Sequence, residues 1–111
     1  MMFLFWACGG NGLHEHIADV PRTAPWSELA LPTGRTVVSG EDGLVVRYPT
    51  AQVDALNSEW SLALRAAGFG LMEDSGRAGM VASTWAREER RLGLSITAIR
   101  GTSTVSLQEL P

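Results

Sequence analysis

Apolar residues repeat with the period of a helix in one stretch of the chain, residues 50–69. At 100° per residue the apolar positions that share one face are Val53, Leu56, Trp60, Leu64 and Ala67. Thr50 is a residue type that caps helix starts, and Gly68 is typical of the position just after a helix end, with Phe69 placed to fold back on Leu64. We therefore expect one long helix, at about residues 50–67, with a single buried stripe.

The stretch before this helix alternates with the period of a strand. Residues 35–39 and 44–48 are rich in β-branched side chains and are separated by the glycine-containing loop 40–43, which predicts a hairpin. In the expected register Val37 lies on the same face as Leu44, Val46 and Tyr48, and that face should meet the helix.

The stretch after the helix predicts a short strand at residues 70–74 and three longer ones at 80–87, 92–99 and 104–110. The turns between them are expected at 75–79, 88–91 and 101–102. This register pairs Trp85 with Leu94, and Ala98 with Val105, so that the bulky side chains share one face. The opposite face is predicted to be polar, and its members are Thr84, Ser95, Thr97, Thr104, Ser106 and Gln108.

The element order is thus ββαββββ with tight connections, which predicts a two-layer α+β domain. We expect an antiparallel sheet of five to six strands with the long helix packed across one face. Within 111 residues one core is expected, in a single domain at residues 34–111. A short apolar segment at residues 1–8 and a flexible leader or tether at 9–33 precede it.

Charge and cysteine content narrow the function classes. The formal net charge of −3 gives no basic footprint for a nucleic-acid partner, which is therefore disfavoured. The single cysteine, Cys8, excludes an intrachain disulfide and a metal site built from several cysteines.

The surroundings of Cys8 point to a membrane. An apolar run precedes it, ending in Phe5, Trp6 and Ala7, and Gly9 begins a glycine-rich spacer. This segment resembles the lipobox of a bacterial lipoprotein signal peptide, with Phe5, Trp6, Ala7 and Cys8 in the matching positions. The resemblance implies that Cys8 is lipidated and that the domain is anchored to a membrane of the cell envelope, at the periplasmic or outer surface.

The leader carries the two histidines, His14 and His16, which as alternate residues of an extended chain share one face. Two ligands do not complete a metal site, so we regard them as weak metal candidates and expect no cofactor. Farther along, Trp26, Leu29 and Leu31 are expected to cover an edge or end of the core.

The sequence offers few candidate catalytic residues. Asp74 and Ser75 are adjacent, but no histidine follows residue 16 to activate the serine. The best-placed polar contact patch is the expected hairpin loop formed by Glu88, Glu89, Arg90 and Arg91, and an exposed sheet edge is a second way to bind a partner.

We therefore expect a non-enzymatic, membrane-tethered binding or scaffold module with an envelope protein as its partner. Two alternatives stay open: a small hydrolase or metal-dependent enzyme completed in a complex, and a soluble cytoplasmic accessory domain. A helix gripped by a curved antiparallel sheet resembles domains in lipoprotein subunits of outer-membrane assembly machines, and this architectural resemblance carries no matching functional residues.

Overall fold

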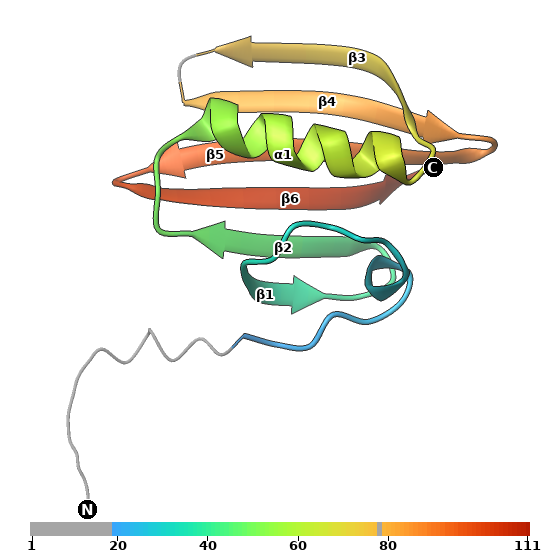
Figure 1. The fold of residues 1–111 in the computed structure, drawn as a ribbon, viewed down its shortest axis with the longest axis horizontal. Coiled ribbons are helices and arrows are strands. Elements are labelled where there is room, and N and C mark those ends of the chain that lie inside the picture. Colours follow the sequence, from blue (N-terminus) through green and yellow to red (C-terminus); the bar gives the residue numbers. More distant parts are fainter. Residues whose placement is uncertain (1–18, 78) are drawn as a thin grey trace, which may run out of the picture.

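The computed structural model describes residues 19–77 and 79–111, and in it one α-helix lies across one face of a six-stranded antiparallel sheet (Figure 1). The strand order is β1-β2-β6-β5-β4-β3, so α1 carries the chain from β2 to the far edge of the sheet. The expected two-layer α+β fold is confirmed. In chain order the elements are the 3-10 helix η2 (Trp26–Glu28), β1 (Arg35–Ser39), β2 (Gly43–Tyr48), α1 (Val53–Ala66), β3 (Gly70–Arg77), β4 (Met80–Arg87), β5 (Arg90–Ile99) and β6 (Thr102–Leu110).

Helix α1 buries the stripe that its spacing predicts, because Val53, Leu56, Trp60 and Leu64 are all buried. Its predicted start is wrong. The helix begins at Val53, since Thr50 Oγ1 accepts a hydrogen bond from the Gln52 N–H (3.2 Å) and so caps no helical N–H group.

The predicted end of the helix is correct. Gly68 has φ 95° and follows the last turn, and its N–H donates to the Arg65 carbonyl at 2.9 Å. The Phe69 N–H donates to the Leu64 carbonyl at 3.0 Å. Together these two bonds form a Schellman motif, which brings Phe69 back against the core, where its side chain is buried.

The first hairpin contains a β-bulge that the alternation did not predict. The register runs from Thr36 opposite Val46 to Val38 opposite Val45, which leaves Val37 as the extra residue. Thr36, and not Val37, is therefore buried beside Val46. The polar groups of Thr36 are satisfied by the leader, because its N–H donates to Asp19 Oδ1 and its hydroxyl accepts from Arg22 Nε.

Both C-terminal hairpins differ from the predicted register: the β4–β5 turn is two residues shorter, and the two-residue β5–β6 turn begins one residue earlier. Arg87 pairs with Arg90, so the turn is Glu88–Glu89, and Ile99 pairs with Thr102, so the turn is Arg100–Gly101. Arg100 and Gly101 both have positive φ, as a type I′ turn requires. Each register is shifted by two residues from the prediction. Because side chains alternate with a period of two, every side chain still lies on its predicted face.

Strand β3 is also longer than predicted. It extends through Arg77, which pairs with Met80, so the expected turn at 75–79 is shortened to the connection between these two residues. A register shift between Leu71 and Glu73 marks a bulge in this strand. Beyond the bulge, Glu73 to Arg77 pair with β4 without interruption.

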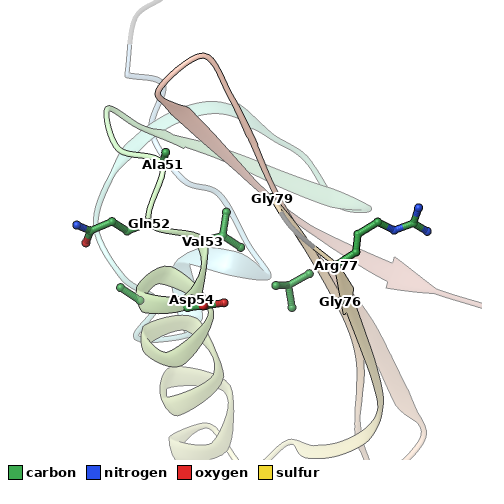
Figure 2. A pocket seen from close by; sticks show the side chains of 9 residues that line it. Ala51, Gln52, Val53, Asp54, Gly76, Arg77 and Gly79 are labelled. Atoms are coloured by element: carbon green, nitrogen blue, oxygen red, sulfur yellow. The ribbon is translucent and has the colours of Figure 1, made fainter.

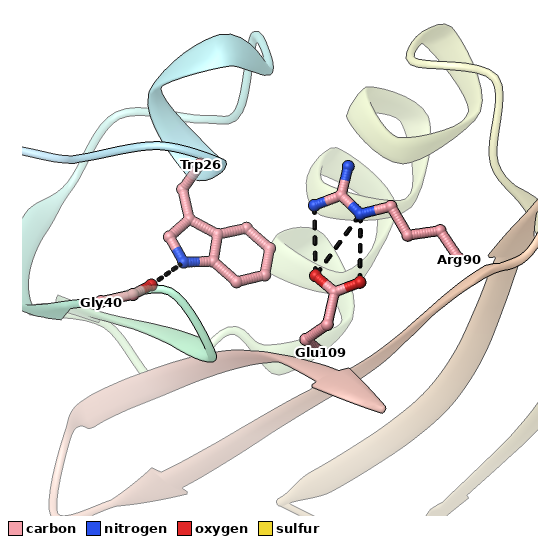
Figure 3. A network of polar contacts seen from close by, with 4 residues as sticks. All are labelled: Trp26, Gly40, Arg90 and Glu109. Atoms are coloured by element: carbon pink, nitrogen blue, oxygen red, sulfur yellow. Dashed lines mark hydrogen bonds and ion pairs between the residues drawn. The ribbon is translucent and has the colours of Figure 1, made fainter. Parts of the chain in front are cut away.

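The leader is part of the fold from Asp19 onward. Trp26 is fully buried, and its indole N–H donates to the Gly40 carbonyl at 2.6 Å (Figure 3). Leu31 is also in the core, and Leu29 packs against it. The folded unit therefore begins before residue 34, and Trp26 and Leu31 close the end of the sheet beside β1 and β2 as their apolar character predicts.

One apolar core lies between sheet and helix. Trp60 and Trp85 are both buried there, as predicted: the Trp60 indole donates to Tyr48 Oη at 3.1 Å and the Trp85 indole to Ser83 Oγ at 2.8 Å. The remaining core residues are Leu44, Val46, Leu92, Leu94, Ile96, Val105 and Leu107. The other face of the sheet presents small hydroxyl side chains to solvent, as the alternation predicts.

Candidate functional site

The predicted contact patch at residues 88–91 is divided by the shorter turn. Glu88 and Glu89 form the exposed turn itself, whereas Arg90 and Arg91 are the first residues of β5. Successive strand residues point to opposite faces, so Arg90 lies on the helix side and Arg91 on the open side. The four residues therefore do not act as one loop.

Two arginines of this region serve the fold. Arg87 Nη1 donates to the Ala67 carbonyl at 2.8 Å, at the C-terminal end of α1, where a cation also suits the helix dipole. Arg87 and Arg90 both lie over the Phe69 ring, 4.7 and 5.7 Å from its centroid. These cation–π contacts join the hairpin turn to the helix end.

Arg90 is further held by Glu109 of β6. Figure 3 shows the guanidinium facing this carboxylate, with Arg90 Nε 3.1 Å from Glu109 Oε2 and Arg90 Nη2 3.2 Å from Oε1. The two side chains are 26% and 29% exposed, so the pair contributes about 0–1 kcal/mol to stability. With Arg90 engaged, the charged groups free to meet a partner here are Glu88, Glu89 and Arg91.

Arg87 and Glu109 carry no signal of their own in the sequence. Nineteen positions separate Glu109 from Arg90, and only the antiparallel order of β5 and β6 brings them together. The shallow hollow of about 300 Å³ at this end of the molecule is lined by Arg87, Glu88, Glu89, Arg90 and Glu109.

A larger hollow, of about 710 Å³, lies between the start of α1 and the end of the β3–β4 hairpin. Its charged members are Asp54, in the first helical turn, and Arg77, whose side chain points away from the helix (Figure 2). A carboxylate already occupies the positive end of the helix dipole, which disfavours an anion at this site. The remaining lining is mostly small or apolar, so the hollow presents no convergent set of polar groups.

The two edges of the sheet differ. At β1 the leader covers the edge: the Val20 N–H donates to the Thr36 carbonyl (2.9 Å), and the Thr23 N–H donates to Ser39 Oγ (2.9 Å). At β3 all eight residues are exposed, and no other segment in the described part of the chain bonds to the outer side of the strand. This leaves β3 as an open edge able to pair with another strand.

The adjacent residues Asp74 and Ser75 do not come together as a site. Asp74 and Ser75 lie on opposite faces of β3, because Asp74 pairs with Ser83 and Ser75 with Ala82. No cluster of three or more potential metal ligands occurs within residues 19–77 and 79–111. The candidates Cys8, His14 and His16 lie outside the described residues.

Tyr48, in β2, has a shifted pKa. Its burial raises the pKa of the phenol above the ordinary value of about 10, and the hydrogen bond from Trp60 partly opposes that effect. Tyr48 packs against the core and holds Trp60, so the shifted pKa marks a structural contact. It does not indicate a reactive group.

Comparison of the chain with protein-family models, curated proteins and solved structures found no match. In the described residues no helix has the length and apolar character needed to cross a bilayer.

Proposed function

We propose that the protein is a non-enzymatic binding or scaffold module, tethered to a membrane of the bacterial cell envelope by a lipid on Cys8. The observation that supports this best is how the chain enters the fold. Residues 19–33 pack along β1 and the adjoining end of the sheet, so a tether would reach the domain at this edge. The β3 edge, at the opposite side of the sheet in Figure 1, stays open.

The dimensions suit such an arrangement. The eleven steps from Cys8 to Asp19 span at most about 40 Å when extended, and five strand spacings put β3 about 24 Å from β1. A tethered domain would thus stay near the membrane with one edge turned toward its anchor. Stable attachment requires more than one acyl chain, as on a multiply acylated cysteine.

Contact with an envelope protein is assigned in this proposal to the exposed end of the β4–β5 hairpin. Glu88, Glu89 and Arg91 are exposed there and none of them supports the core. A surface of mixed charge suits a polar partner patch of complementary charge, which sets orientation and association rate.

Anchoring is tested by expressing the protein with its own upstream region in a bacterial host and separating membranes from soluble proteins. The unaltered protein should fractionate with membranes, and Cys8→Ser should release it. Gly10→Ser keeps the cysteine and is the matched control, expected to stay with membranes. Equal distribution of the Cys8→Ser and unaltered proteins would refute the tether.

Partner contact is tested by capture from detergent-solubilised envelopes with Glu88, Glu89 and Arg91 all changed to Ser. This variant leaves the Arg90–Glu109 pair intact, so the melting temperature should hardly change. The matched control changes Glu41, Asp42 and Arg100 to Ser, three exposed residues with the same sum of charges. We expect capture to weaken only in the first variant.

A different outcome of the capture experiment would move the contact elsewhere. If capture survives the triple change but is lost in Asp74→Pro, which blocks the outer edge of β3, the partner binds by strand addition and the assignment to the hairpin end is wrong.

A further inference from the structure

We infer that the open edge of β3 pairs with β3 of a second copy of this chain, antiparallel and centred on Ser75. The inference does not depend on anchoring at Cys8. It follows from the length of the regular part of this strand, the direction of its free backbone groups and the charges on its side chains.

The regular part of β3 is short and has a definite centre. The bulge between Leu71 and Glu73 interrupts the strand on one side, and the strand ends at Arg77 on the other. Five residues, from Glu73 to Arg77, keep a continuous register with β4. A two-fold axis at Ser75 overlaps all five with their counterparts, whereas any other centre loses overlap.

The free backbone groups match this centre. Arg77 and Met80 flank a two-residue turn and so form a hydrogen-bonded pair, from which pairs alternate along the strand. Ser75 and Glu73 therefore bond to β4, while Asp74 and Gly76 direct their N–H and C=O groups to the open edge. With the two-fold axis at Ser75, Asp74 of each copy lies opposite Gly76 of the other copy. Each of these two residue pairs can exchange two backbone hydrogen bonds.

Charge favours the same register. Glu73 of one copy lies opposite Arg77 of the second copy, twice over, because the pairing is symmetric. These are non-hydrogen-bonded positions, where side chains across strands approach most closely. A two-fold axis one residue earlier would instead set Asp74 against Asp74, which like charge disfavours.

The helix-side face of the strand tolerates the pairing. Asp74 meets a glycine of the second copy, which has no side chain. The two Asp74 carboxylates become diagonal neighbours, and each shares its groove with Arg65 of α1, whose positive charge offsets their repulsion. Exposed apolar side chains flank the paired segment at its two ends: Leu71 and Met72 are 41% and 53% exposed at the start of β3, and Met80, opposite Arg77, is 36% exposed.

Charge reversal tests this register in the full chain, with self-association measured by sedimentation velocity. Glu73→Arg sets two arginines opposite each other and Arg77→Glu sets two glutamates, so each should weaken dimerisation about tenfold or more. The double variant Glu73→Arg/Arg77→Glu restores both pairs and should restore the dimer. A protein that is monomeric at all concentrations, or a dimer indifferent to single reversals, would overturn the inference.

Cysteine cross-linking gives a second measurement. In the full chain with Cys8→Ser, Ser75→Cys places two thiols at Cα positions about 4.5 Å apart, within disulfide range. Met72→Cys, also on β3, lies roughly 20 Å from its counterpart in this register and is the control. Oxidation should cross-link the Ser75→Cys protein alone, and equal cross-linking of the two variants contradicts the register.

Discussion

Trp60 holds the helix to the sheet, and its removal provides the most direct test of the fold. The side chain is fully buried at the centre of the α1 stripe, and its indole N–H donates to Tyr48 Oη at 3.1 Å. A buried tryptophan removes roughly 150–250 Å² from water, worth about 4–6 kcal/mol at 25 cal/mol per Å². Because the surroundings relax partly, Trp60→Ala should cost about 3–5 kcal/mol.

Denaturation in urea measures this cost. Far-UV circular dichroism is the better signal, because the chain has four tryptophans and fluorescence would mix them. The total stability of such a domain is about 5–15 kcal/mol, so Trp60→Ala leaves a small margin. Trp60→Phe keeps an aromatic ring and loses the indole hydrogen bond, and should cost about 1–2 kcal/mol.

Glu59→Ala is the control for this series, since Glu59 precedes Trp60 on the same helix and is exposed. It should change stability by less than about 0.5 kcal/mol. A cost below about 1 kcal/mol for Trp60→Ala, with an unchanged urea slope, would mean that the helix does not pack through this face, and the reasoning would fail.

Two further predictions concern Tyr48 and Gly68. Because the pKa of Tyr48 is raised in the folded protein, its contribution to stability is complete below pH about 10 and is lost as pH rises through the folded-state pKa. Tyr48 is the only tyrosine and the chain has no lysine, so Tyr48→Phe should flatten the alkaline fall in the free energy of unfolding; a slope that persists would contradict this. Gly68→Ala should cost about 1–2 kcal/mol in urea melts, because the φ of Gly68 is 95° and the added Cβ would lie 3.2 Å from Arg87 Cδ. The control is Gly40→Ala, which should be nearly neutral because Gly40 has no positive φ and no atom lies within 4 Å of the added Cβ. Equal effects of the two alanines would refute the C′ assignment.

The order of elements and the face taken by most side chains could be predicted from the sequence. The α1 stripe follows from helical spacing, and the burial of Trp60 and Trp85 follows from period and pairing parity. The predicted registers of both C-terminal hairpins were wrong by two residues, but the predicted faces were correct, because a shift of two residues returns each side chain to the same face. Local periodicity therefore determined the two layers.

The candidate site was predicted less completely from the sequence than the fold was. Glu88, Glu89 and Arg91 are exposed at the hairpin end, as a contact patch requires, but Arg90 is committed to Glu109 and Phe69. That commitment depends on neighbours distant in sequence, which no local spacing reveals.

Only the tertiary structure decided the exact registers and the two edges. Thr36 replaces Val37 in the core because Asp19 and Arg22 of the leader satisfy its polar groups. Strand β3 runs through Ser75 and Gly76, residues of low strand propensity, because the segment from Glu73 to Arg77 pairs with β4 without interruption. The physical reason is the same in each case: the free energy comes from contacts between segments far apart in the chain, whereas periodicity records only which face a residue shares with its near neighbours.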